Sequence, residues 1–553
     1  MGWHDEMGFP ILSVITFLPL AGVLLIFAVD AVRRLLGQAG LRAAADPETT
    51  RRWYPLTYKL ISLVVTLASF ALAVLMLVRF DTDEAAMQFT EDVTWIERFN
   101  IHYSFGVDGI AALLVFLTTL LGFVVIVAGW NYVKDRERGF FAFLLLLQTG
   151  MVGVFCATDI FLFYVVWEAM LVPMYFLIGV WGGPRRVYAA IKFFLFTLVG
   201  SLLMLVAIVV VVYYTRNASL GVGAALTFDI RELSDQVYPY HIQFWAFLAF
   251  FLAFAIKVPM WPLHTWLPDA HVEAPTAGSV ILAGVLLKMG GYGMLRFCLP
   301  MFPDAAVDFV PLVVALSIIA IIYGALVSMV QKDLKKLVAY SSVSHMGFVT
   351  LGIFVAIAVA GNAAGMEGAI LVMLSHGFLT GALFLLVGFL YERTHTREIA
   401  EMSQLAKPMP VAAGFFLFFT LGSLGLPGLS GFVGEFLSLL GLFRYSHWLA
   451  ALAATGVVLA ACYLLWMYQR VLFNDRGDDD YMPRDGLFDF GVREIVSLAP
   501  LVVFAVWLGV YPNTFLDFLH VPVRDIIEHV QPSFARDHGQ GLSELFTTMR
   551  GLL

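Results

Sequence analysis

The segment Lys257-Val-Pro-Met-Trp-Pro262 decides the fold, because it places a lysine and two prolines inside the otherwise apolar run 242–262. A helical run of this length spans the roughly 30 Å hydrocarbon core of a membrane. Each proline removes a helical N–H donor, so Pro259 and Pro262 predict an interruption at membrane depth. Such an interruption is tolerated where the backbone is buried in protein or lines water. We therefore expect a helix that is broken beside a charge.

The composition extends this expectation to the whole chain. Of 553 residues, 60% are hydrophobic and 13% are charged, against roughly 45–50% and about 25% in soluble domains. The net charge of -8 excludes the basic stripe that a nucleic-acid partner requires. Cys156, Cys298 and Cys462 lack the paired spacing of a metal site and are expected to be packing residues. No nucleotide loop or haem-ligand pair is present, so we expect no cofactor in this chain.

Apolar runs of spanning length recur along the chain and predict an all-α polytopic membrane protein with about 14 transmembrane helices. The first run is not followed by a small-residue cleavage site, so we expect a permanent span and not a signal peptide. The connecting segments are too short for a separate soluble domain, and 1–553 is expected to be a single integral membrane domain. The runs are 10–29, 56–79, 107–129, 139–157, 159–181, 189–214, 242–262, 276–297, 307–330, 337–360, 367–391, 410–443, 449–471 and 494–515.

The distribution of cations predicts the sidedness of these spans, because cytoplasmic loops retain lysine and arginine. With the N-terminus outside, 21 of the 33 lysines and arginines fall in inner loops. The loop 263–275 carries neither residue type and adds no support. Both termini are therefore predicted to lie on the outer side.

A second interruption is predicted in the run 410–443, within Gly425-Leu-Pro-Gly-Leu-Ser-Gly-Phe-Val-Gly-Glu435. It again combines a proline, Pro427, with a nearby charge. The two breaks lie in spans 7 and 12, and a unit of five helices repeats in inverted orientation. We therefore expect two inverted five-helix repeats, 139–297 (spans 4–8) and 307–471 (spans 9–13).

Several ionisable residues lie inside predicted spans, where a charge costs about 2.5–3.5 kcal/mol and usually faces protein or water. One interpretation is a structural ion pair between Glu168 and Lys257, with histidines bonded to serine hydroxyls. The other is a proton relay, and the number of acids, bases and histidines over several spans favours it. The candidate relay residues are Glu168, Lys257, Lys288, His345, His376 and Glu435.

Three further sets of residues are ambiguous. Lys192 lies only a few residues inside its span and can extend to the surface, so structural and functional roles are equally supported. His264 and His271 flank the proline-rich break; proton uptake is one hypothesis, and loop histidines with satisfied hydrogen bonds are the favoured one. The cluster Lys332, Lys335 and Lys336 is interpreted as a determinant of topology.

Desolvation explains why these residue types suit proton transfer. Burial lowers the pKa of lysines and raises that of carboxylic acids, which brings both towards neutrality. At ~6 Å and an effective dielectric constant of ~20, the Coulomb energy of a pair is about 3 kcal/mol. Moving Glu168 relative to Lys257 would therefore load or unload the lysine proton.

Three stretches resemble the antiporter-like membrane subunits of proton-pumping NADH:quinone oxidoreductase, respiratory complex I. Glu435 in the second broken helix, where paralogues have lysine, points to the subunit M branch. Together with the number of spans, the resemblance covers most of the chain. The stretches are Lys257-Val-Pro-Met-Trp-Pro-Leu-His-Thr-Trp-Leu-Pro-Asp-Ala-His-Val-Glu-Ala-Pro275 with Lys288-Met-Gly-Gly-Tyr-Gly-Met-Leu-Arg296, then Lys335-Lys-Leu-Val-Ala-Tyr-Ser-Ser-Val-Ser-His-Met-Gly347, and Gly425 to Glu435.

The resemblance implies a role for each part. Glu168 and Lys257 would form the control pair, Lys288 and His345 would carry protons laterally, and Glu435 would be the terminal exchange group. FMN, iron–sulfur clusters and quinone would belong to partner subunits, with neighbouring antiporter-like subunits as partners in a bacterial inner membrane. The alternatives are a subunit of a multisubunit sodium/proton antiporter or membrane-bound hydrogenase, and a purely structural membrane subunit.

Overall fold

The computed structural model describes residues 2–3, 8–38, 47–219, 226–359, 361–402, 404–473 and 487–534. Within them, 13 helices are long and apolar enough to cross a membrane, and the run 410–443 is covered by two shorter helices. The predicted polytopic helical architecture with about 14 spans is therefore confirmed. Parts of the 30–55 loop and of the tail after 516 lie outside the described residues.

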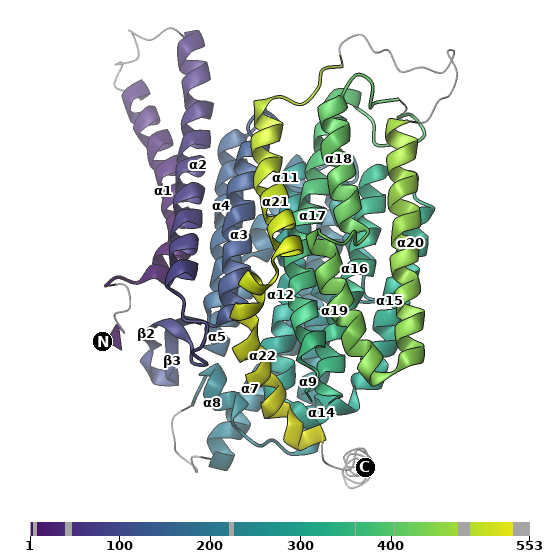
Figure 1. Cartoon of the computed structure of the whole chain (residues 1–553). Coiled ribbons are helices and arrows are strands. Elements are labelled where there is room, and N and C mark those ends of the chain that lie inside the picture. The colour runs from purple at the N-terminus through teal and green to yellow at the C-terminus, as the bar shows by residue number, and fades with distance from the viewer. Residues whose placement is uncertain are drawn as a thin grey trace.

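A helical hairpin of α1 (Ile11–Gln38) and α2 (Pro47–Arg79) forms one side of the molecule, and its upper end leans away from the other helices (Figure 1). Next to it lie α3 (Gly109–Ala128) and α4 (Glu137–Cys156). The side chain of Asp108 caps α3 by accepting from the backbone N–H of Ala111. Such a cap satisfies one of the free donors at a helix start.

A three-stranded antiparallel sheet combines two strands from the connection between α2 and α3 with one that precedes α1, and the helical periodicity did not predict it. Its order is β1 (Gly2–Trp3), β2 (Gln88–Ile96) and β3 (Ile101–Val107), with the 3₁₀ turn η1 (Glu97–Phe99) between the last two. The buried carboxylate of Glu91 on β2 accepts from the backbone N–H groups of Leu12 and Ser13. The sheet is thereby tied to the start of α1.

The fifth span consists of two helices, α5 (Ile160–Ala169) and α6 (Leu171–Trp181), which meet at Met170. The predicted continuous run 159–181 is therefore interrupted. The cause is Pro173, which lacks the N–H that would bond the carbonyl of residue 169 and crowds that carbonyl. Two helices follow, α7 (Arg186–Ser219) and the short α8 (Ile230–Ser234).

The seventh and eighth spans depart furthest from a straight helix. Residues 258–265 separate α9 (Tyr240–Lys257) from α10 (Trp266–Glu273). The eighth span contains two π-helical segments, and such segments occur mostly where a helix serves a function. In order, this span comprises α11 (Thr276–Ile281), the π-helix η2 (Leu282–Leu286), α12 (Leu287–Gly293), the π-helix η3 (Met294–Cys298) and α13 (Leu299–Met301).

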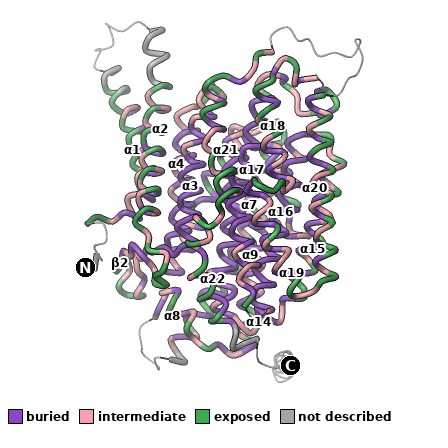
Figure 2. Tube along the Cα trace, viewed as in Figure 1, coloured by how far each residue is buried: buried purple, intermediate pink, exposed green. Residues whose placement is uncertain are grey.

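The second half of the chain is built around α17 (Ala363–Thr394), which lies near the middle of the bundle (Figure 1). The apolar windows of α17 and of the 276–301 span are entirely buried, whereas those of α2, α20 and α21 are one-third buried. Figure 2 shows the same contrast between the inner and outer helices. The other helices of this half are α14 (Pro303–Asp308), α15 (Val310–Met329), α16 (Leu334–Ile357), α18 (Pro410–Ser423), α19 (Ser430–Tyr445) and α20 (His447–Leu472).

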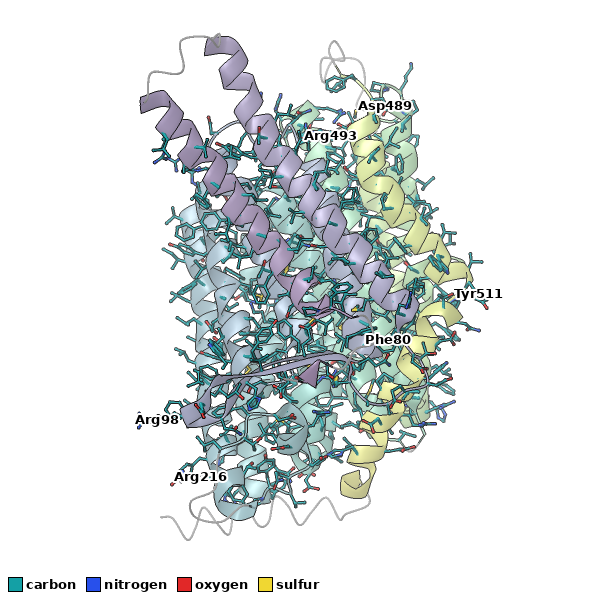
Figure 3. All side chains as sticks on the ribbon, turned by 90° about the vertical axis from the view of Figure 1, so that its left-hand side faces the viewer. Phe80, Arg98, Arg216, Asp489, Arg493 and Tyr511 are labelled. Atoms are coloured by element: carbon teal, nitrogen blue, oxygen red, sulfur yellow. The ribbon has the colours of Figure 1, made fainter. Side chains whose placement is uncertain are left out.

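The last predicted run, 494–515, is also divided, into α21 (Val492–Val510) and α22 (Asn513–Phe534). Figure 3 shows Asp489 and Arg493 at one end of the molecule and Arg98 and Arg216 at the other, with Tyr511 at the bend between α21 and α22. Charged side chains at both ends and apolar helices between them are the arrangement expected of a membrane-spanning bundle.

Candidate functional site: a row of buried ionisable side chains

Lys257 is the last residue of α9 and is almost completely buried, with 1% of its surface exposed. Its Nζ has no hydrogen-bond partner within the described part of the chain. The ammonium group instead lies 5.2 Å from the ring centre of Trp167 and 5.5 Å from that of Phe193. Aromatic faces stabilise a cation less than an acceptor does, so this charge is only partly compensated.

Glu168 lies in the last turn of α5, beside the break at Met170. Its Oε1 is buried without a hydrogen-bond partner among the described residues, while the carboxylate interacts with the side chain of Ser201. In the same part of the chain, no ion pair within 4.0 Å joins Glu168 to Lys257, although the two interact electrostatically. The structural ion pair considered from the sequence is thus not formed in this structure.

Lys288 and His376 are in direct contact in the interior. Lys288, at the start of α12, is fully buried, and its Nζ lies 2.7 Å from Nδ1 of His376 on α17. The same Nζ donates to the carbonyl of Ala283, which belongs to the π-helix η2. An ammonium group only donates, so Nδ1 accepts and the neutral ring carries its proton on Nε2. That Nε2 is buried and has no partner among the described residues.

His345 and Glu435 form a second direct contact. Nδ1 of His345 on α16 lies 2.7 Å from Oε1 of Glu435 on α19, and both side chains are less than a tenth exposed. The ring of His345 also lies beside that of His376, with the two ring centres 6.0 Å apart. The four side chains therefore follow one another from α12 to α19.

The interruption between α18 and α19 places Glu435 at this position. Gly425 and Gly428 have φ values of 83° and 91°, a region that glycine occupies without steric cost. A Cβ on Gly425 would lie 3.6 Å from Oε2 of Glu435. A Cβ on Gly434 would lie 2.6 Å from the backbone nitrogen of Val372, so glycine is needed for α19 to approach α17.

Lys192 and His264 lie apart from this row. Nζ of Lys192 is 2.6 Å from Oδ2 of Asp269 and donates to the carbonyl of Thr265, 2.8 Å away. Since the side chains of this pair are 20% and 26% exposed, Lys192 reaches towards the surface. His264 is buried within the break 258–265, beside the ring of Tyr323 at 5.2 Å, and its Nδ1 has no partner in the described chain.

Two buried residues were underestimated from the sequence. His271 is 0% exposed, stacks on Phe384 at 4.5 Å and has no hydrogen-bond partner on either ring nitrogen within the described residues. The preferred interpretation as a loop histidine with satisfied hydrogen bonds therefore does not fit His271 within the described residues, and for His264 it stays a prediction. Lys335 is 6% exposed and donates to the carbonyl of Ala274. The sequence did not indicate that Lys335 is buried, because it belongs to a basic cluster and such clusters normally set topology.

The row consists of side chains that can transfer protons. The described residues contain no group of three or more histidine, cysteine, aspartate or glutamate side chains able to bind a metal ion. Imidazole, ammonium and carboxylate groups at hydrogen-bonding distance are instead the groups that exchange protons. The six relay candidates thus fall into two sets, Glu168 with Lys257 and the row from Lys288 to Glu435.

Comparison with known proteins identifies the family. Residues 157–460 match the family described as NADH:quinone oxidoreductase/Mrp antiporter, TM. NADH-quinone oxidoreductase subunit M of Rhodobacter capsulatus is 46% identical over 94% of this chain and 96% of its own. NADH-ubiquinone oxidoreductase chain 4 of Marchantia polymorpha is 43% identical over 85% and 91%.

Two solved structures share the fold. A chain of respiratory complex I from Thermus thermophilus with bound NADH superposes with a TM-score of 0.79 at 31% identity, covering 94% of this chain and 99% of the other. A chain of the Mrp complex from Dietzia sp. gives 0.75 at 20% identity, over 95% and 100%, which supports the fold alone. This chain belongs to the antiporter-like membrane subunits of NADH:quinone oxidoreductase, in the subunit M family.

Proposed function

We propose that this chain moves protons across the membrane through its buried Glu, Lys and His residues, driven by electron transfer in other subunits of an NADH:quinone oxidoreductase. One observation carries the proposal: Lys288, His376, His345 and Glu435 follow one another in the interior, with polar contacts of 2.7 Å at both ends of the series. Each extra ionisable group in a membrane interior is energetically costly, and such groups usually mark a functional site. A structural role alone does not account for the whole row.

The pair of Glu168 and Lys257 would control whether a proton leaves the first half of the protein. Glu168 sits beside the helix break at Met170, and Lys257 sits beside the break that follows α9. At ~6 Å and an effective dielectric constant of ~20, their Coulomb energy would be about 3 kcal/mol. Moving one proton against 100 mV requires ~2.3 kcal/mol. The energy gained or lost when the two groups change their separation is therefore comparable to the energy that pumping requires.

The other predicted residues would serve proton uptake. Lys192 is held by Asp269 near the break that contains His264, and His271 lies on the same helix as Asp269, α10. Residues 139–297 and 307–471 would be two inverted units, since the proline-containing interruptions α9–α10 and α18–α19 lie in their fourth spans. We place both chain termini on the outer side, because most lysines and arginines then face inward.

The redox chemistry would lie in partner subunits. FMN, iron–sulfur clusters and quinone are expected there, and neighbouring antiporter-like subunits and membrane lipids would surround this chain. The protein from Thermus thermophilus is itself a chain of respiratory complex I. A bacterial inner membrane is the expected location.

The decisive test replaces each member of the control pair in the intact complex. We expect Glu168→Ala and Lys257→Ala to lower coupled NADH:quinone turnover and proton translocation while the complex still assembles. Normal pumping in both variants would leave only a structural role.

Co-purification decides between a complex I subunit and a sodium/proton antiporter or hydrogenase subunit. Flavin and iron–sulfur clusters that purify with this chain, together with NADH oxidation, would support complex I. The alternative rests on the Mrp likeness at 20% identity, whereas the subunit M relatives reach 46%.

A further inference from the structure

The second nitrogen of His345 is contacted by a residue that the proposed relay does not use. Tyr463 on α20 is fully buried, and its hydroxyl lies 3.4 Å from Nε2 of His345. This contact is longer than the 2.7 Å that separates Nδ1 of the same ring from Glu435. One nitrogen is thus bound tightly by a carboxylate and the other loosely by a phenol.

The chemistry of these partners fixes the proton on the ring. An ionised carboxylate only accepts hydrogen bonds, so Nδ1 of His345 must carry the proton that Glu435 accepts. Nε2 of the neutral ring is then an acceptor, and the Tyr463 hydroxyl must donate to it. Which nitrogen of a histidine is protonated is commonly set by a partner of this kind.

Ser341 lies beside the Tyr463 hydroxyl. Its side chain interacts with Tyr463, while its own hydroxyl donates to the carbonyl of Val338 at 2.8 Å, and it precedes His345 by one helical turn on the same face of α16. When Nε2 is unprotonated, Tyr463 donates to it; when Nε2 carries a proton, the phenol oxygen accepts a hydrogen bond from that N–H and the phenol O–H turns towards Ser341. The hydroxyl is therefore able to accompany His345 through both protonation states.

We propose that Tyr463, supported by Ser341, is a positioning residue that holds His345 in the tautomer that donates to Glu435 and leaves Nε2 free to accept a proton. This inference rests on the proposed proton-transfer function. The titratable or charged groups that face His345 are Glu435 on α19, His376 on α17 with Lys288 behind it, and Tyr463 on α20.

The test is proton pumping by the intact complex in sealed membrane vesicles, expressed per assembled complex from its flavin content. We expect Tyr463→Phe to lower the pumping rate by about two- to tenfold, the factor that corresponds to one hydrogen bond. The midpoint of its pH profile should also move, because the hydroxyl touches the nitrogen that takes up the proton. The matched control is Tyr468→Phe on the same helix, whose hydroxyl donates to the backbone carbonyl of Ala413 at 3.4 Å.

A double-mutant cycle separates positioning from packing. Ser341→Ala should lower pumping less than Tyr463→Phe does, and the combined variant should be no slower than Tyr463→Phe alone, because Ser341 acts through Tyr463. A Tyr463→Phe complex that matches the Tyr468→Phe control in rate and pH profile would overturn the inference. So would additive losses in the combined variant.

Glu435→Gln measured in parallel distinguishes failure of this inference from failure of the proposed function. If Glu435→Gln impairs pumping while Tyr463→Phe does not, the relay stands and the role of Tyr463 is lost. If Glu435→Gln pumps normally, the proposed function fails first, and the inference fails with it.

Discussion

The interrupted seventh and twelfth spans hold their charges in opposite ways. Lys257, at the end of α9, faces aromatic rings and has no hydrogen-bond partner among the described residues. Glu435, in the second turn of α19, is 2.7 Å from His345. Both side chains are buried, so the difference lies in pairing and not in exposure. The first region keeps its acid and amine apart, and the second keeps its acid and base together.

The difference in pairing predicts where a change of charge would have the larger effect. A buried charge without a partner costs several kcal/mol, whereas a paired one is largely compensated. The energy of the first region, Glu168 with Lys257, should therefore change strongly when a charge moves. In the second region, His345 and Glu435 are already in contact and can exchange a proton. Substitutions at four positions test this contrast.

Replacing the unpaired lysine should have the largest effect. Lys257→Met keeps the length of the side chain and removes the ammonium, and we expect pumping to fall on the order of tenfold or more, as for loss of a proton-transfer group. The thermal midpoint of the complex should not fall, because an uncompensated charge is removed. Pumping and thermal unfolding are measured on the same preparation; a large loss of stability would show that Lys257 is structurally paired.

Replacing the paired acid should separate charge from shape. Glu435→Gln still accepts a hydrogen bond from His345 but no longer ionises, so we expect pumping to fall by about tenfold. Glu435→Asp keeps the carboxylate and should largely retain pumping. The measurement is vesicle acidification driven by NADH, and equal activity of the two variants would remove the exchange role of Glu435.

Neutralising the acid of the first region should have an intermediate effect. Glu168→Gln keeps the contact with Ser201 and removes a Coulomb interaction of about 3 kcal/mol at ~6 Å. We expect roughly fivefold slower pumping with an unchanged amount of assembled complex, measured by flavin content. Ser201→Ala is the control, and a greater loss in Ser201→Ala than in Glu168→Gln would assign the effect to the hydrogen bond.

The partly exposed pair should matter least. Lys192 bonds Asp269 with both side chains at least 20% exposed, and exposed pairs contribute about 0.2–1 kcal/mol. Lys192→Ala should therefore slow pumping by about twofold or less. A loss as large as that of Lys257→Met, assayed side by side, would place Lys192 within the relay.

The sequence predicted the spans because apolar length determines membrane crossing directly. It also located the interruptions in the seventh and twelfth spans, since Pro259 and Pro427 mark them. The break at Met170 was not predicted, because one proline, here the third residue of α6, often merely kinks a helix. The sheet was missed because β2 and β3 lie in a long connection without membrane periodicity and β1 has only two residues.

The site was predicted less completely than the fold. The presence of ionisable residues in apolar runs identified Lys288, His345, His376 and Glu435. The contact between Lys288 and His376 was not predicted, because it depends on how α12 and α17 pack. The separation of Glu168 from Lys257 likewise depends on helix positions that no spacing encodes. His271 gave a weak signal, because a histidine near prolines is typical of loops.

The most direct test of the central claim, that protons pass along the buried row, is pumping by a complex that carries Lys288→Met. This change removes the first link of the row, the contact with His376, and replaces it with an apolar side chain of similar length. We predict that NADH oxidation by an artificial acceptor, which needs only the redox subunits, stays unchanged while quinone-coupled pumping falls by about tenfold or more. Pumping at the wild-type rate in this complex would show that protons do not pass along the buried row.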